Sequence, residues 1–100
     1  MKTTINEQDE RIIVFLEGEL DTAAALETEQ ALQPLMENNG RDILFDCAEL
    51  DYIASSGLRI LISILKSARA QGRKVILKDV NDDIKNVFKL TGFINLFDFE

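Results

Sequence analysis

Two adjacent serines are the residues of this 100-residue sequence that are best placed to do chemistry. Ser55 and Ser56 precede Gly57, where a helical pattern begins. A serine hydroxyl is a preferred N-cap, because it accepts from a free N–H group of the first helical turn. One helix needs one cap, so we expect Ser56 to cap and Ser55 to lie just outside with a free hydroxyl. A phosphate on Ser55 would face the helix N–H groups. From the residues alone, plain capping and phosphate acceptance both stay open.

Most other catalytic and metal-binding arrangements are missing from the sequence. It contains no histidine and a single cysteine, Cys47. This excludes a Ser-His-Asp triad, the usual zinc sites and a CxxC redox pair. No GxGxxG motif and no glycine-rich loop with a Walker lysine is present either. We interpret Cys47 as a small core residue and the Asp82-Asp83 pair as charges at a helix start. The sequence therefore predicts no enzyme, no metal site and no cofactor.

Composition and charge are those of an ordinary globular chain. With 46% hydrophobic and 29% charged residues, positions 1–100 are expected to form one domain. The net charge of −7 argues against nucleic acid or anionic lipid as the main partner. The longest apolar run, residues 12–16, is far shorter than the roughly 20 residues that cross a membrane, and no signal peptide is visible. We expect a cytoplasmic protein without direct nucleic-acid binding or membrane insertion.

Hydrophobic periodicity divides the chain into alternating strands and helices, with the five glycines as punctuation between them. The predicted strands are 2–6, 11–18, 43–45 and 74–78, the predicted helices about 22–38, 57–71 and 81–92, and residues 93–99 form an edge strand or tail. A polar turn makes the first two strands antiparallel, and the later alternation favours parallel pairing with right-handed crossovers. The predicted fold is a small single-domain α/β protein with a mixed, mostly parallel sheet of four or five strands and three main helices.

Several positions carry more specific expectations. Asp21 or Thr22 should cap the first helix and Gly40 should end it. The run 43–45 is apolar throughout, which is typical of a strand covered on both faces. The third helix should bury one face, made of Ile84, Val87, Phe88 and Thr91.

The predicted helix over 57–71 is basic, with three positive charges and no acid. Its apolar stripe consists of Leu58, Leu61, Ile62, Leu65 and Ala68. Ile60 and Ile64 lie more than about 60° from the centre of this stripe, at ~100° per residue. Together with Arg59 they form a candidate partner-binding patch. The alternative is that neighbouring elements cover the two isoleucines.

Two motifs together resemble the STAS domain family. They are Gly18-Glu19-Leu20-Asp21 after a strand, and Asp46 followed by Leu50 and by the run 53–58, which reads Ile-Ala-Ser-Ser-Gly-Leu. More narrowly, the sequence is similar to the anti-sigma factor antagonists of bacterial partner-switching systems, over essentially its whole length.

The resemblance implies a phosphorylation site. In this family the first serine of the pair accepts the phosphoryl group, which maps to Ser55. The aspartate of the Gly-x-Leu-Asp turn lies beside the acceptor, which maps to Asp21. Asp46, Ser56 and Gly57 complete the expected surroundings. Many antagonists have an aspartate immediately before the acceptor serine, whereas this sequence has alanine there.

The resemblance also implies a mechanism and partners. An unphosphorylated antagonist binds a serine-kinase anti-sigma factor and so frees the sigma factor. The kinase phosphorylates the antagonist and releases itself, and a PP2C-type phosphatase reverses the modification. The alternative is a standalone STAS subunit docked on a membrane transporter or a signalling assembly, which would bind constitutively. The Ser55-Ser56-Gly57 motif favours the antagonist, and Ala54 keeps the alternative open.

Overall fold

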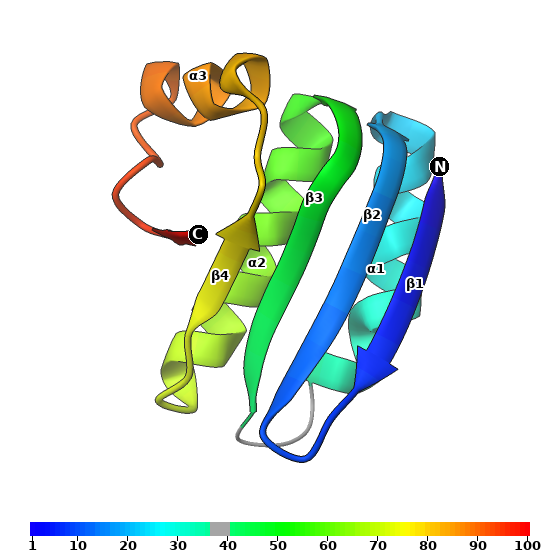
Figure 1. Ribbon diagram of the computed structural model, residues 1–100, viewed down its shortest axis with the longest axis vertical. Coiled ribbons are helices and arrows are strands. Elements are labelled where there is room, and N and C mark those ends of the chain that lie inside the picture. The colour runs from blue at the N-terminus through cyan, green and yellow to red at the C-terminus, as the bar shows by residue number, and fades with distance from the viewer. Residues whose placement is uncertain (37–40) are drawn as a thin grey trace.

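The computed structural model describes residues 1–36 and 41–100, and it shows one sheet with helices packed against it (Figure 1). The elements in chain order are β1 (Lys2–Glu7), β2 (Arg11–Leu20), α1 (Thr22–Met36), β3 (Asp42–Ile53), α2 (Ser55–Ala70), β4 (Val75–Lys78), α3 (Asp82–Leu90) and β5 (Asp98–Phe99). The strand order follows the chain, β1-β2-β3-β4-β5, with β1 antiparallel to β2 and every other pair parallel. The predicted α/β class, mixed sheet and three main helices are confirmed.

Both α1 and α2 lie on the same face of the sheet (Figure 1). Alternate residues of β2 point toward them, because side chains of a strand alternate between the two faces, and Ile12, Val14 and Leu16 are fully buried there. Ile43 and Phe45 of β3 join this core, whereas Leu44 points to the opposite face and lies outside the core cluster. Neither α1 nor α2 covers that opposite face. All three residues of the run 43–45 are nonetheless buried, so the expectation that this run is covered on both faces is confirmed.

Strand β3 is much longer than the predicted run 43–45, and it is bulged. Phe15 of β2 pairs with Asp46 of β3, and Glu17 pairs with Glu49. The paired residues are two positions apart in β2 and three apart in β3, so β3 contains one extra residue here. A second shift of register follows, between Gly18 and Glu19. Each extra residue reverses the side-chain alternation of a strand. As a result Asp46 and Glu49 share the face away from the helices, and Leu50 turns into the core.

The third helix is capped at its start by Asn81. The side-chain oxygen of Asn81 accepts from the Ile84 N–H at 2.9 Å, and its amide donates to the Leu50 carbonyl at 3.1 Å, which ties α3 to the end of β3. Ile84 and Phe88 are buried as predicted, and Val87 is half-buried. Thr91 is exposed, since α3 ends one residue before it, so its predicted burial is wrong.

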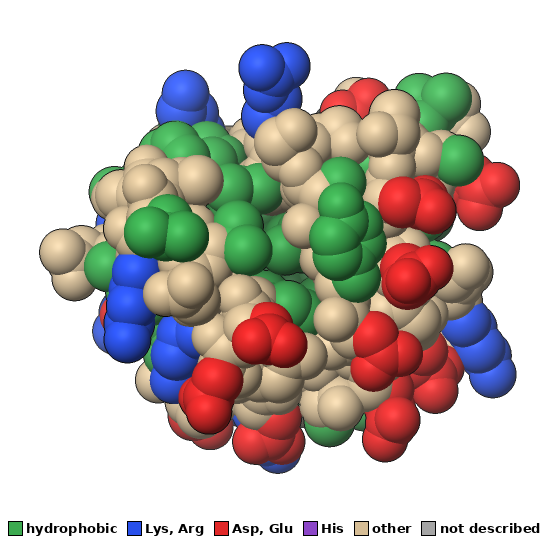
Figure 2. All heavy atoms as spheres, turned by 90° about the horizontal axis from the view of Figure 1, so that it is seen from above, with side chains coloured by type: hydrophobic (Ala, Val, Ile, Leu, Met, Phe, Trp, Pro, Cys, Tyr) green, Lys and Arg blue, Asp and Glu red, His purple; other side chains and the backbone are tan. Residues whose placement is uncertain are grey.

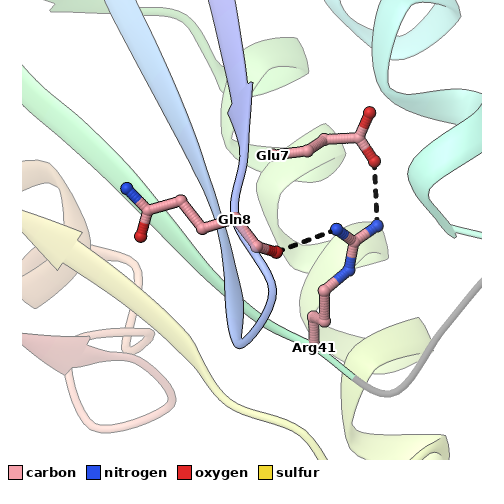
Figure 3. A network of polar contacts seen from close by, with 3 residues as sticks. All are labelled: Glu7, Gln8 and Arg41. Carbon is pink, nitrogen blue, oxygen red and sulfur yellow. Dashed lines mark hydrogen bonds and ion pairs between the residues drawn. The ribbon is translucent and has the colours of Figure 1, made fainter.

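A network of polar contacts stabilises the end of the sheet that lies away from α3 (Figure 3). The Arg41 guanidinium donates to the Gln8 carbonyl at 3.0 Å and to the Glu7 carboxylate at 2.8 Å. It thereby links the end of β1 to the chain just before β3.

Helix α1 ends at Met36, and the predicted terminator Gly40 lies outside the described residues. No helix in the described part of the chain is long and apolar enough to cross a membrane.

Candidate functional site

The ends of β2 and β3 bring the first turns of α1 and α2 together. Leu20 pairs with Ile53 in register, and the N–H of Ala54 donates to the Leu20 carbonyl at 2.9 Å. Asp21 is the next residue after Leu20, and Ser55 is the next after Ala54. Two residues that are 34 positions apart in the sequence are thus placed at the same end of neighbouring strands.

Asp21 is the N-cap of α1. Its Oδ1 accepts from the Ala24 N–H at 2.9 Å, and its carbonyl accepts from the Ala25 N–H at 2.8 Å. Of the two predicted caps, the structure selects Asp21, and Thr22 becomes the first residue of the helix. The Asp21 carboxylate is therefore held at this end of the molecule by the backbone of α1.

Helix α2 begins in a different way, with Ala54 as its N-cap and no side-chain cap. Ala54 stays extended, with φ −86° and ψ 165°, because its N–H continues the sheet to Leu20. Ser55 and Ser56 are the first two residues of the helix. The prediction that Ser56 caps and that Ser55 lies outside the helix is wrong. Ser56 instead donates its hydroxyl to the Thr22 hydroxyl at 3.2 Å, which joins the two helices.

Ser55 presents an exposed hydroxyl at a helix start that no side chain caps. Within the described chain this hydroxyl has no hydrogen-bond partner. The first turn of α2 contains no acidic residue. A phosphate attached here would lie at the positive end of the helix dipole, close to N–H groups that no side chain satisfies. The surroundings of Ser55 are suited chemically to a covalent phosphate.

Gly57 allows the first turn of α2 to lie directly on the last residue of β2. A Cβ added at Gly57 would lie 2.7 Å from Cγ of Leu20 and 2.9 Å from its carbonyl oxygen. Both separations are shorter than real carbon contacts. Gly57 therefore lies within α2 and allows this helix to pack closely on β2. The prediction that Gly57 only separates two elements is wrong.

Asp46 does not belong to the surroundings of Ser55. It lies in β3 beside Phe15 of β2, while Ile53 lies beside Leu20, five residues further along β2. At roughly 3.3 Å per residue this places Asp46 about 17 Å from that end of the strand. Its carboxylate accepts from the Ala48 N–H at 3.1 Å, within the bulge. Of the residues expected around Ser55, Asp21, Ser56 and Gly57 lie at the same end of the molecule as Ser55, and Asp46 does not.

The predicted partner-binding patch on α2 is only partly present. Arg59 is exposed, as the prediction requires. Ile60 and Ile64 are only 8% and 2% exposed, and both belong to the core cluster. The proposed role of the two isoleucines is wrong, and the alternative of cover by neighbouring elements holds. Helix α2 lies against both the sheet and α1, so a wider arc of its surface is buried than one stripe.

Two large apolar side chains that the sequence analysis did not select are exposed on the elements that form this end. Tyr52, next to the end of β3, is 49% exposed, and Leu26 in α1 is 58% exposed. Periodicity alone could have found Leu26, since it lies off the buried face of α1 formed by Ala25, Thr28 and Leu32. Both side chains are available to a protein partner.

Cys47 is buried, and it takes no part in the site. Burial raises the pKa of its thiol from 9.0 to about 12, helped by the negative charges of Asp46 and Asp79. A thiol with this pKa is neutral near pH 7 and a poor nucleophile. The described residues also contain no group of three His, Cys, Asp or Glu side chains that could hold a metal ion.

Comparison with known proteins gives a consistent result. The STAS domain family model matches residues 2–100. BtrV of Bordetella bronchiseptica, described as an anti-sigma factor antagonist, is 30% identical over 97 residues, which cover 97% of this chain and 84% of that protein. The anti-sigma-B factor antagonist of Staphylococcus aureus is 30% identical over 89 residues, covering 89% and 82%.

The fold is also that of SpoIIAA, an anti-sigma factor antagonist and cell fate determinant of Bacillus. Its unphosphorylated form matches with a TM-score of 0.85 at 18% identity, covering 99% of this chain and 88% of that one. Its phosphorylated form matches with a TM-score of 0.79 at 18% identity, covering 99% and 91%. The similarity to both forms shows that the same arrangement of strands and helices is present here.

Proposed function

Because the chain belongs to the STAS domain family, we propose that it is an anti-sigma factor antagonist that is switched by phosphorylation of Ser55. In its unmodified form it binds a serine-kinase anti-sigma factor and so regulates transcription. The kinase phosphorylates Ser55 and dissociates, and a PP2C-type phosphatase restores the hydroxyl. The protein is then a cytoplasmic substrate and binding module, with no catalysis of its own.

The observation that carries this proposal is the position of Ser55. Its hydroxyl is exposed, it lies at the start of α2, and no side chain occupies the helix N–H groups beside it. Ser56, by contrast, uses its hydroxyl to contact Thr22. A kinase therefore finds at Ser55 an exposed hydroxyl that has no hydrogen-bond partner among the described residues, and the helix start tolerates the added charge.

The switch acts through charge on a docking surface. Phosphorylation adds about −1.5 to −2 charges at pH 7. We place the kinase on the surface formed by the starts of α1 and α2, with Ser55 at its centre and Arg59 and Tyr52 near its edges. A partner that docks against a neutral hydroxyl would then have to accommodate a doubly charged group, and its affinity falls.

A pull-down followed by labelling tests the proposal. Unmodified protein and a Ser55→Asp variant are each immobilised and incubated with lysate of the native organism. We expect a kinase-related protein to be retained by the unmodified form alone. With ATP, this kinase should add one phosphate, which mass spectrometry locates at Ser55. Continued labelling of a Ser55→Ala variant would contradict the assignment, and equal retention by both baits would favour the constitutive STAS subunit.

A further inference from the structure

Helix α2 has one exposed stripe, and Ser55 is its first residue. The exposed residues of the helix, which make up the stripe, are Ser55, Arg59, Ser63, Lys66, Arg69 and Ala70. At about 100° per residue they fall within an arc of roughly 120°, and the buried residues of α2 occupy the opposite side. Ser55 therefore shares its surface with the basic residues of the helix, and it is separated from the core.

Arg59 is the first basic residue of the exposed stripe. It follows Ser55 by four residues, so the two Cα atoms are about 6 Å apart along the helix axis and about 40° apart around it. Long side chains of a helix extend back toward its N-terminus and cover the preceding turn. The guanidinium of Arg59 can therefore reach the side chain of Ser55 without any change of the backbone.

Among the described residues, the side chain of Arg59 forms no ion pair and no hydrogen bond. The other basic residues of α2 are not equivalent to it. Arg69 donates to the Leu96 carbonyl at 2.8 Å, and Lys66 lies about 16 Å from Ser55 along the helix. Helix α2 contains no acidic residue that could compete for Arg59. Arg59 is therefore the basic residue of α2 that is available to a phosphate on Ser55.

Positive and negative charges are separated at the end of the molecule where α1 and α2 begin. Figure 2 looks down on this end, and the helices, which lie behind the sheet in Figure 1, occupy the upper part of the view. Most acidic side chains lie in its right and lower parts, and basic side chains project at its upper left margin. An anion at the start of α2 thus meets positive charge on the same helix, which favours an ion pair with Arg59.

We propose that Arg59 has two alternative ligands, a carboxylate of the kinase in the unmodified protein and the phosphate of Ser55 after phosphorylation. This inference rests on the proposed function and adds a second component to the switch. Phosphorylation adds negative charge to the docking surface and also withdraws Arg59 from the partner. A guanidinium donates two parallel hydrogen bonds to either anion. The anion lies N-terminal to the cation in the helix, which is the favourable order for a pair four residues apart.

The contact between the phosphate and Arg59 can be tested without a kinase, in full-length protein that carries phosphoserine incorporated at position 55 during synthesis. Titration by ³¹P NMR measures the second pKa of the phosphate, which is ordinarily about 6. Arg59→Gln should raise this pKa by about 0.2–0.7, because an exposed ion pair favours the dianion by a factor of up to about five. Arg59→Lys should restore part of the difference. Lys66→Gln removes one positive charge two turns further along α2 and is the matched control, which should leave the pKa unchanged. Asp21 is present in every variant, so its effect on the phosphate cancels.

Affinity for the kinase measures the withdrawal of Arg59 from the partner. Arg59→Gln should weaken binding of the unmodified protein up to about fivefold, the value of one exposed ion pair. Phosphorylation should then weaken binding of the variant by a smaller factor than it weakens binding of the wild type, since the variant has no Arg59 to lose. Arg59 is exposed, so the variant should keep the circular dichroism spectrum of the wild type.

Three results would overturn the inference. They are an equal phosphate pKa in the wild type and in Arg59→Gln, an equal rise of this pKa in Lys66→Gln, and an equal effect of phosphorylation on the affinity of both proteins. None of them concerns which serine the kinase modifies. Failure of the kinase to label Ser55 would instead overturn the proposed function, while the incorporated phosphoserine would still report the contact with Arg59.

Discussion

The Ser56 hydroxyl donates to the Thr22 hydroxyl at 3.2 Å, and this contact joins the first turn of α2 to the first turn of α1. Two adjacent serines thus have different surroundings, since Ser55 is exposed and Ser56 is turned toward the neighbouring helix. Variants in which only one of the two serines is replaced can therefore test the role of each serine.

Replacing Ser56 by alanine should leave phosphorylation of Ser55 in place. The variant loses one exposed hydrogen bond, so we expect the free energy of unfolding to fall by about 1 kcal/mol or less. Mass spectrometry after incubation with the kinase should still find one phosphate, at Ser55. A Thr22→Ala variant removes the same contact from the other side and should show a similar loss. Phosphate on Ser56 in the wild type would contradict this division of roles.

Phosphorylation of Ser55 should change binding and leave the fold intact. The helix start stabilises an exposed anion by about 0.3–1 kcal/mol, while the Asp21 carboxylate opposes it. With Asp46 about 17 Å away along β3, this opposition is smaller than a site with both aspartates would give. The melting temperature should stay within a few degrees, as ~4–8 °C corresponds to 1 kcal/mol in a domain of this size. Affinity for the kinase should fall tenfold or more. Loss of the circular dichroism spectrum on phosphorylation would show that the modification unfolds the protein.

Substitutions of Asp21 should separate its capping role from its charge. Asp21→Asn keeps a good N-cap, so its stability should match the wild type, while phosphorylation slows because the negative charge is gone. Asp21→Ala removes the cap as well and should cost about 1 kcal/mol. Chemical denaturation and initial labelling rates measure the two effects. Wild-type labelling of Asp21→Asn would mean that Asp21 is only structural.

Gly57→Ala should destabilise the fold although alanine favours helices. The added Cβ meets Leu20 at 2.7 and 2.9 Å, and overpacking of this kind costs about 1–3 kcal/mol. The higher helix propensity of alanine offsets up to about 1 kcal/mol of this cost. Leu20→Ala alone should cost about 2–5 kcal/mol because it opens a cavity at a fully buried position. In that background Gly57→Ala should cost less than it does in the wild type, because the contact with Cγ is gone and only the one with the carbonyl oxygen is left. A Gly57→Ala variant as stable as the wild type would mean that α2 moves away from β2 at little cost.

The Cys47 thiol should be unreactive in the native protein. Its pKa is raised to about 12, so iodoacetamide at pH 8 should modify it only after unfolding in urea. Between pH 9 and 12 the thiol of the native protein therefore keeps its proton, whereas the thiol of the unfolded chain, with its ordinary pKa of 9.0, has lost it. This contribution to stability is complete below pH 9 and is lost as the pH rises toward 12, by at most about 1.4 kcal/mol per pH unit. A Cys47→Ala variant should lack this part of the pH dependence; fast native alkylation would contradict the burial.

The fold could be predicted from the sequence because its signals are local. Apolar runs, helix periodicity and a cap residue such as Asp21 predict the elements and their order, and the alternation of strands and helices predicts the parallel pairing. The start of α2 could not be predicted in the same way. Serine is the better N-cap by local preference. The hydrogen bond from Ala54 to Leu20, which spans 34 residues, makes Ala54 the N-cap, so the helix starts two residues closer to the N-terminus than predicted.

The misplaced site residues have the same cause. Ile60 and Ile64 lie off the main stripe of α2, and they are buried because a second helix packs beside the first. Asp46 is close to Ser55 in the sequence, but β3 runs extended from Asp42 to Ile53 and separates the two in space. Each of these errors reflects a contact between distant segments, which periodicity and spacing do not encode.

The order of the strands in the sheet has a consequence for how the protein is made. Every strand neighbours the strand before it in the chain, so each new strand can dock on an edge that is already formed. During synthesis the β1–β2 hairpin emerges first, and the β3, β4 and β5 edges follow from the ribosome in the order in which they are needed. No strand has to wait for a distant partner, which keeps the mean sequence separation of contacts low for a parallel sheet. We therefore expect this domain to fold from its N-terminal side, and to fold faster than a parallel sheet of the same size whose strands pair out of chain order.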